Sequence, residues 1–241
     1  MNLLLDIGNT SSKLAIYDGE KKITSLRTRH FSCEKMEKTF EPYQEKLKKA
    51  IVSSVRAMPE FIIDLATHGI PYVHILSHKS KLPFRNDYET PETLGTDRLA
   101  AVAGAYLFFK GKKVLIIDAG SAVTYDFLSG DIYSGGNISP GLAMRFRALH
   151  RFTEKLPLAS TTEKYLSPGK STLGAITAGV IDGLIFEINE YISSFQQKYE
   201  GGEVILTGGD SGYLRGRISR SVNYMPDIVL DGLNLILEFN A

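Results

Sequence analysis

The stretch that decides the fold is LLDIGNTSSKLAIYDG at residues 4–19, and a similar stretch, IIDAGSAVTYDFLSG, occupies residues 116–130. Each contains an apolar run, an Asp-x-Gly turn and a second apolar run, which is the pattern of two antiparallel strands joined by a tight loop. Asp6 and Asp118 hold the same place in the two copies, and twice their separation nearly spans the 241 residues. The repeat predicts an internal duplication with two similar α/β halves, residues 1–112 and 113–241.

The rest of the chain carries further strand and helix patterns. Apolar runs bounded by turn residues predict strands at residues 22–27, 50–55, 71–76, 131–138 and 204–206. Helical patterns are expected at residues 31–49, 59–67, 97–109, 140–151, 172–199 and 231–239. The polar segment 78–93 is expected to be a functional loop. We therefore predict mixed sheets flanked by helices.

Composition and charge exclude several classes of protein. The chain is 43% hydrophobic and 23% charged, which is typical of a globular protein. Lys and Arg number 28 against 27 Asp and Glu, so there is no basic field to favour nucleic acid as a partner. No apolar run approaches the ~20 residues of a membrane helix, and a single cysteine fits a reducing compartment. We expect a cytoplasmic protein that binds neither nucleic acid nor membrane.

The first Asp-x-Gly loop has the composition of a phosphate-binding loop. Consecutive backbone N–H groups in such a turn can converge on an anion, and hydroxyls and a lysine add donors and positive charge. Asp6 would repel a phosphate, so we expect it to hold Mg²⁺, directly or through water. A plain hairpin turn containing Asn would give the same pattern. The predicted ATP-binding residues of this loop are Asp6, Ile7, Gly8, Asn9, Thr10, Ser11, Ser12 and Lys13.

The second loop supplies a matching set of groups. Asp118 provides a carboxylate, the loop backbone provides N–H donors and Ser121 provides a hydroxyl. Gly208 and Gly209 follow the strand at residues 204–206, where bare backbone would let a base or sugar lie close. A simple strand-to-helix turn explains the two glycines equally well. The chain has no Gly-x-x-x-x-Gly-Lys-Ser/Thr motif, so it is not a P-loop protein.

A third segment, PETLGTDR at residues 91–98, places Asp97 and Arg98 at the start of an apolar helix. The carboxylate can accept the proton of a substrate hydroxyl, and the guanidinium can bind a substrate carboxylate. The bland alternatives are a helix N-cap for Asp97 and a surface charge for Arg98. Together the three segments predict a kinase for a small hydroxylated molecule.

These motifs, with GGNISPG at residues 135–141 and LTGG at residues 206–209, resemble the type III pantothenate kinases of the actin, hexokinase and acetate kinase superfamily. The resemblance covers nearly the whole chain. It implies a duplicated ribonuclease-H-like fold, a homodimer, and transfer of the ATP γ-phosphate to pantothenate in the first step of coenzyme A synthesis.

The resemblance also implies roles for single residues. Asp97 is similar in position to the catalytic base, and Asp118 to the site of a monovalent cation, K⁺ or NH₄⁺. Ser121 stands where the family commonly has Thr. The implied pantothenate contacts are Tyr88, Gly95, Thr96, Asp97, Arg98 and Thr172.

Two other functions fit the same phosphate loops. A kinase for another small hydroxylated metabolite would differ only around Tyr88, the Gly95 to Arg98 segment and Thr172. A non-catalytic, actin-like nucleotide-binding regulator would keep both loops without needing Asp97.

Overall fold

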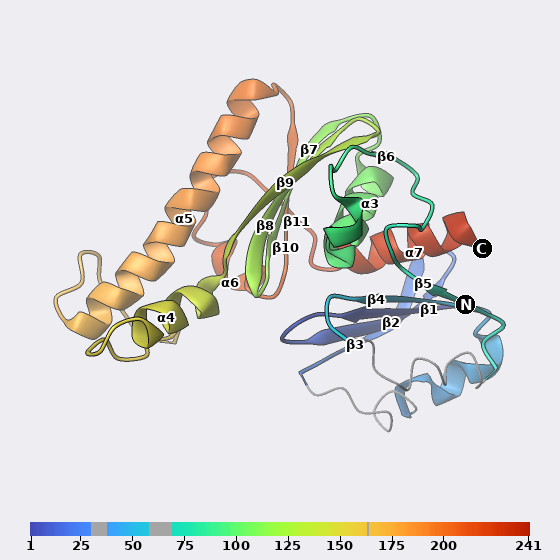
Figure 1. The fold of residues 1–241 in the computed structure, drawn as a ribbon, viewed down its shortest axis with the longest axis horizontal. Helices are drawn as coiled ribbons and strands as arrows, with labels where there is room; N and C mark the ends of the chain where they lie inside the picture. The colour runs from blue at the N-terminus through green and yellow to red at the C-terminus, as the bar shows by residue number, and fades with distance from the viewer. Residues whose placement is uncertain (30–37, 58–68, 163) are drawn as a thin grey trace. The chain divides into compact units, whose positions relative to one another are not determined.

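The computed structural model describes residues 1–29, 38–57, 69–162 and 164–241 (Figure 1). The chain forms two compact units. The first unit comprises Met1–Gly111, Leu128–Gly135 and Asp227–Ala241, and the second comprises Lys112–Phe127 and Gly136–Pro226.

A five-stranded sheet is the base of the first unit. Its strands are β1 (Asn2–Ile7), β2 (Ser12–Asp18), β3 (Lys21–Thr28), β4 (Lys49–Ser54) and β5 (Tyr72–Ile75), in the order β3-β2-β1-β4-β5. The β1–β2 and β2–β3 pairs are antiparallel, whereas β4 runs parallel to both β1 and β5. Leu3, Leu5 and Ile7 on β1 face a buried core, because alternate residues of a strand point to the same side.

The second sheet repeats this strand order. It contains β6 (Arg85–Asn86), β7 (Lys113–Ala119), β8 (Ala122–Ser129), β9 (Ile132–Pro140), β10 (Glu203–Thr207) and β11 (Asn223–Tyr224), in the order β11-β10-β7-β8-β9-β6. Strand β10 runs parallel to β7 and β11, as β4 does to β1 and β5. The order β9-β8-β7-β10-β11 therefore matches β3-β2-β1-β4-β5, and β6 is an addition at the edge.

Two helices of the first unit pack closely against each other. They are α3 (Thr96–Phe108) and α7 (Ile228–Asn240), which lie side by side in Figure 1. A Cβ atom added at Gly232 would lie 1.8 Å from the carbonyl oxygen of Ala100, so the two backbones meet where only glycine fits. Asn234 also accepts a 2.9 Å hydrogen bond from Asn2 on β1. Helix α7 thus holds α3, which carries Asp97, next to the first sheet.

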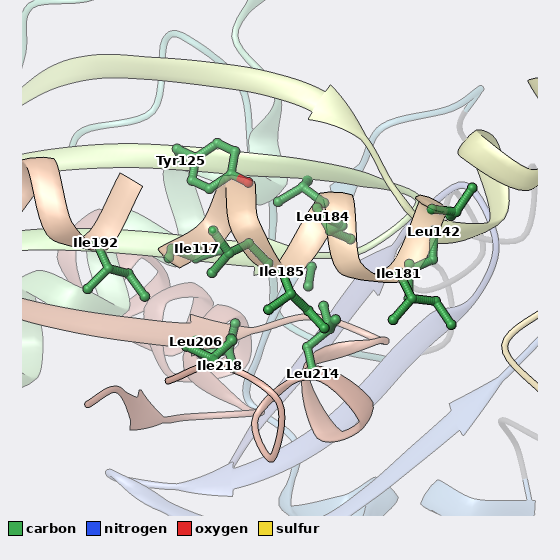
Figure 2. Packing of buried hydrophobic residues seen from close by; sticks show 14 of the residues in the cluster. Ile117, Tyr125, Leu142, Ile181, Leu184, Ile185, Ile192, Leu206, Leu214 and Ile218 are labelled. Atoms are coloured by element: carbon green, nitrogen blue, oxygen red, sulfur yellow. The ribbon is translucent and has the colours of Figure 1, made fainter. Parts of the chain in front are cut away.

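The core of the second unit forms between its sheet and α5 (Thr172–Lys198), with α4 (Leu142–Arg151) and the short α6 (Ser211–Leu214) beside it. Figure 2 shows Ile181, Leu184 and Ile185 of α5 packed with Ile117 of β7 and Leu206 of β10. Burying each such side chain contributes roughly 1.5 to 3 kcal/mol.

Among the described residues, α5 is the one helix long and apolar enough to cross a membrane by length and composition. Ten of its residues are buried in the protein, including Ile181, Leu184 and Ile188. A buried core helix can pass the same test of length and composition.

Most of the predicted elements are found, with corrections at their ends. In its described part, the helix predicted at residues 31–49 is confirmed for residues 38–46, which are α-helical at 38–40 and form the 3-10 helix η1 (Glu41–Lys46). Its end is wrong, because β4 begins at Lys49. Lys49 belongs to the strand because it pairs with Asn2 on β1. The helix predicted from Pro140 begins instead at Leu142, since Pro140 ends β9.

The segment before α3 and the start of the terminal helix also differ from expectation. The segment 78–93 is not all loop, because it contains β6 and the 3-10 helix η2 (Pro91–Thr93). The terminal helix begins at Ile228 rather than at Asp231. The helix predicted at residues 59–67 and the single cysteine, Cys33, lie outside the described residues.

Candidate active site

The first predicted phosphate loop is the turn between β1 and β2. Asp6 pairs with Lys13 and Ile7 with Ser12 in the antiparallel register, and the backbone N–H of Gly8 donates a 3.1 Å hydrogen bond to the carbonyl of Ser11. A Cβ atom at Gly8 would lie 2.9 Å from that carbonyl, so the turn requires glycine. Asn9 and Thr10 are exposed at its tip.

The buried members of this loop have a different role. Ile7 is fully buried and Ser12 is 2% exposed, so neither side chain faces solvent. Their backbone groups are what they could offer to a phosphate. For Ile7 and Ser12, the predicted contact with phosphate can therefore involve only backbone atoms.

Asp6 has an unusual electrostatic environment. Burial and the nearby carboxylate of Asp97 raise the pKa of Asp6 to about 6, although Lys13 acts in the opposite direction. Two carboxylates that oppose each other's ionisation would both be stabilised by a cation. This environment fits the hard cation predicted for Asp6.

The substrate segment begins α3 and is tied to the first sheet. Thr96 Oγ1 lies 2.9 Å from Ser53 Oγ on β4, and it also donates a 3.4 Å hydrogen bond to the carbonyl of Ser54. Ser53 is fully buried and pairs in register with Asp6. Helix α3 therefore starts beside the strand that neighbours Asp6, which brings Asp97 close to the first loop.

Asp97 sits in the first turn of α3, where its Oδ1 accepts a 2.8 Å hydrogen bond from the backbone N–H of Arg98. A Cβ atom at Gly95 would lie 2.5 Å from this oxygen. Gly95 thus leaves room for the carboxylate to fold back on the helix terminus, where N–H groups and the helix dipole favour negative charge.

Arg98 is not the surface charge that one alternative proposed. It is 5% exposed, and its guanidinium carbon lies 5.4 Å from the centre of the Tyr88 ring. A buried cation beside an aromatic face can bind an anionic group strongly, because little water competes. The structure thus joins Tyr88 and Arg98, which lie on different elements.

The second predicted loop lies in the second unit at the ends of β7 and β10. Asp118 pairs in register with Thr207, and the turn is closed by a 3.0 Å hydrogen bond from Gly120 N–H to the Ala122 carbonyl. Gly208 has a positive φ of +96°, and a Cβ atom there would lie 2.4 Å from Asp118 Oδ1. Gly208 is therefore required both by its backbone angle and by the carboxylate packed against it.

The remaining predicted residues of the second unit have few contacts that point to a binding site. The carbonyl of Ser121 accepts a 3.2 Å hydrogen bond from the Gly141 N–H, and Gly209 is exposed just before α6. Thr172 is exposed as the first residue of α5, after the N-cap residue Ser171, whose Oγ accepts a 3.1 Å bond from Gly174 N–H. The two glycines after β10 do form a strand-to-helix turn, as the bland alternative supposed.

The predicted residues thus form two groups. Asp6 to Lys13, Tyr88 and Gly95 to Arg98 belong to the first unit, whereas Asp118, Ser121, Thr172, Gly208 and Gly209 belong to the second.

Ser53 and Tyr133 were missed by sequence reasoning. Ser53 interrupts an apolar strand with a hydroxyl, which was a usable signal. Tyr133 has no such signal, because its contacts depend on the pairing of β6 with β9.

The surroundings of Asp118 also fit a bound cation. Thr207 Oγ1 is buried and has no hydrogen-bond partner among the described residues. A carboxylate and a hydroxyl on paired strands are oxygen ligands of the kind that hard cations take. No cluster of three or more His, Cys, Asp or Glu residues suited to a metal occurs in the described ranges, so any such ion needs ligands beyond these side chains.

The two sheets share one strand order, and each contains a strand–turn–strand loop with an aspartate. These features define the duplicated ribonuclease-H-like fold of the actin-like ATPases. The activator of the 2-hydroxyisocaproyl-CoA dehydratase from Clostridium difficile, solved with bound ADPNP, has a similar fold with a TM-score of 0.54. It is 13% identical, and the match covers 99% of this chain and 93% of that one.

Sequence comparison gives the family. The model of the type III pantothenate kinases matches residues 2–194. Type III pantothenate kinases from Bacteroides fragilis and Phocaeicola vulgatus are 42% and 43% identical over the whole chain, and the match covers 98% and 99% of their lengths. The chain belongs to the type III pantothenate kinase family.

Proposed function

We propose that this protein transfers the γ-phosphate of ATP to the primary hydroxyl of pantothenate, giving 4'-phosphopantothenate in the first step of coenzyme A biosynthesis. Membership of the family supports the reaction. The observation that carries it at the level of the site is the bond between Thr96 and Ser53, which fastens the substrate segment to the strand beside Asp6.

The first loop would hold the phosphates of ATP. Asn9 to Ser11 would offer backbone N–H groups, and Gly8 lets the backbone approach closely. The exposed Asn9 and Thr10 offer side chains, and Lys13 offers positive charge. From the second unit, Ser121 would contact phosphate, and Gly208 and Gly209 would lie against the nucleoside. Phosphoryl transfer gains most from such positioning, because its transition state is loose.

Asp97 would orient the pantothenate hydroxyl and take its proton as the phosphate is transferred. Its Oδ1 is held by the Arg98 N–H, which fixes the carboxylate in one direction. Arg98 would bind the carboxylate of pantothenate, and Tyr88 would lie against the same substrate. Gly95, Thr96 and, from the second unit, Thr172 complete the proposed substrate contacts.

Two cations are part of the proposal. Asp6 would hold Mg²⁺, directly or through water, and Asp118 would hold K⁺ or NH₄⁺ with Thr207 beside it. When bound, these ions neutralise the negative charge of the polyphosphate.

Further proposals concern the organisation of the chain. The shared strand order supports two related halves, residues 1–112 and 113–241, with α7 crossing back to pack on α3. We also propose a homodimer, which gel filtration would test, and a cytoplasmic location without a nucleic-acid or membrane partner.

A substrate panel tests the function. The purified protein, with ATP, Mg²⁺ and K⁺, is assayed for ADP formation with pantothenate and with a set of other small hydroxy acids. We expect pantothenate to be preferred by at least about tenfold in kcat/KM, because an acid that places its hydroxyl wrongly when its carboxylate is bound loses contacts worth about 1.4 kcal/mol or more. Preference for another acid would indicate a different metabolite kinase, and ADP formation without any acceptor would favour the regulator.

A further inference from the structure

Tyr88 is held in place by the first part of β9, up to Gly135, which belongs to the first unit. Its segment pairs with β9 through Arg85 opposite Ile132 and Asn86 opposite Tyr133. The pairing continues past the strand end, because Asp87 N–H donates a 3.0 Å hydrogen bond to the carbonyl of Tyr133. The residue before Tyr88 is therefore fixed to the backbone of Tyr133.

The Tyr88 ring also lies against Tyr133. The two ring planes are 5° apart and their centres are 6.2 Å apart, which is an offset stack. Tyr133 is fully buried, and Phe84 contacts it edge-on at 6.5 Å. Because Tyr133 is fully buried and belongs to a paired strand, its ring is a rigid support for the half-buried Tyr88 ring.

Gly135 provides the second support. It has a φ of +99°, and a Cβ atom there would lie 3.5 Å from Tyr88 Cδ2. An alanine Cβ would therefore make ordinary van der Waals contact with the Tyr88 ring, and its strain would come from the positive φ of the β9 backbone beside that ring. Gly135 thus allows the β9 backbone conformation beside which the Tyr88 ring packs.

The same Tyr88 ring lies within 5.4 Å of the Arg98 guanidinium. Tyr88 therefore connects β9 to the arginine at the start of α3. Arg98 is 5% exposed, so a small shift of the ring changes the surroundings of a buried cation rather than of a solvated one.

We propose that Tyr133 and Gly135 are positioning residues that fix Tyr88 and, through it, the Arg98 guanidinium, and so set the affinity for the carboxylate of the acceptor. This rests on the proposed function for the identity of the acceptor. The positioning itself rests on contacts within the first unit. Neither residue touches the acceptor or the reacting atoms in this proposal.

The kinetic test compares Tyr133→Leu with Tyr133→Phe, which keeps the ring. Phe84→Leu is the matched control, because Phe84 contacts Tyr133 without stacking on Tyr88. For Tyr133→Leu we expect the KM for pantothenate to rise about tenfold, with kcat and the KM for ATP within about twofold, as a lost cation–π support predicts. For an uncharged amide of pantothenate, which has no carboxylate, the rise should be about twofold or less. Tyr133→Phe and Phe84→Leu should resemble the wild type.

A second measurement does not depend on catalysis. Phenylglyoxal modifies arginine side chains, and its rate at Arg98 can be followed by mass spectrometry. We expect Tyr133→Leu and Gly135→Ala to increase that rate at least about threefold over wild type, while Tyr133→Phe and Phe84→Leu leave it unchanged.

The outcomes separate the two proposals. A wild type without activity on pantothenate overturns the proposed function, and the Arg98 labelling still decides the positioning role. An active wild type whose Tyr133→Leu variant has unchanged KM for pantothenate and unchanged labelling overturns the positioning role. Equal increases in KM for the acid and the amide also overturn it, because the effect would then not pass through the arginine.

Discussion

The two strand–turn–strand loops of this protein have the same kinds of residues but different neighbouring groups. Asp6 is paired in register with the hydroxyl residue Ser53, and Asp118 with the hydroxyl residue Thr207. The Ser53 hydroxyl is bonded to Thr96, and Asp97 raises the pKa of Asp6. In the second loop the Thr207 hydroxyl has no partner among the described residues, and Gly208 packs directly on the carboxylate.

This difference shows that equivalent positions of a duplicated fold can have different roles. In the first unit, the hydroxyl of Ser53 beside Asp6 binds Thr96 and so holds α3, the helix that carries Asp97. In the second unit the same position is left with an oxygen atom that a cation could use. Within its own unit, the first loop is thus tied to the segment proposed for the acceptor, whereas the second keeps oxygen atoms that suit the proposed cation.

The largest effect is expected for Asp97→Asn, since Asp97 is the proposed base and lies close enough to raise the pKa of Asp6. The loss of a general base lowers kcat by about 10² to 10⁴. The melting temperature should change little, and binding of ATP should persist. Asp18→Asn, which removes an exposed carboxylate at the end of β2, is the control and should leave kcat unchanged. Near-normal turnover by Asp97→Asn would sink its assignment as the base.

Gly208→Ala should be more harmful than the matching change in the first loop, Gly8→Ala. The added Cβ would lie 2.4 Å from Asp118 Oδ1 at a φ of +96°, whereas at Gly8 it meets only a carbonyl 2.9 Å away. We expect Gly208→Ala to destabilise the protein by at least about 2 kcal/mol and to raise the KM for ATP.

Gly216→Ala, where a Cβ meets nothing within 4 Å, is the control for thermal unfolding and kinetics. A Gly208→Ala variant as stable as this control would show that the second loop is not built around the carboxylate.

Asp6→Asn tests the burial of the first carboxylate in metal-free buffer. The folded pKa of Asp6 is about 6, above its usual 3.8, so the stability this group contributes is present below pH 4 and is lost as pH rises to 6. The neutral Asn avoids that loss. Asp6→Asn should therefore be more stable than wild type at pH 8 by about 2 to 3 kcal/mol, with no such advantage near pH 3.5.

The measurement is urea unfolding of both proteins across this pH range, with Asp18→Asn as the exposed control. A stability difference that does not depend on pH would contradict the raised pKa of Asp6. The same substitution should nevertheless reduce activity, because the proposed ligand of Mg²⁺ is lost.

The smallest effects separate the two hydroxyls. Ser53→Ala breaks the bond to Thr96 and should cost about 1 kcal/mol, while Thr207→Val removes an unpartnered hydroxyl and should be neutral or stabilising by about 1 kcal/mol without K⁺. Urea unfolding measures both. Equal losses for the two variants would remove the distinction between the loops.

Much of the fold was readable because its signals are local. The repeated Asp-x-Gly turns mark the strand pairs, and apolar periodicity marks α3 and α5. Short elements escaped, since β6 and β11 exist only through pairing with β9 and β10, which are distant in sequence. The helix start was predicted wrongly at Pro140, because proline is common at the start of a helix, whereas here it ends β9.

The candidate site divides in the same way. Asp6, Asp97 and Asp118 stand out because carboxylates follow strands or open a helix. Ser53 and Tyr133 act by contact with residues far along the chain, so their part depends on tertiary structure. Arg98 could be read either way from sequence, and its burial decided against a surface charge.

The most direct test is to follow the phosphate itself. Phosphorus NMR of the protein with ATP, Mg²⁺, K⁺ and pantothenate should show a new phosphate ester on the primary hydroxyl of pantothenate, formed in step with ADP. Without pantothenate, ATP should remain intact. Release of inorganic phosphate at the same rate with and without pantothenate, and no ester, would contradict the assignment as a pantothenate kinase.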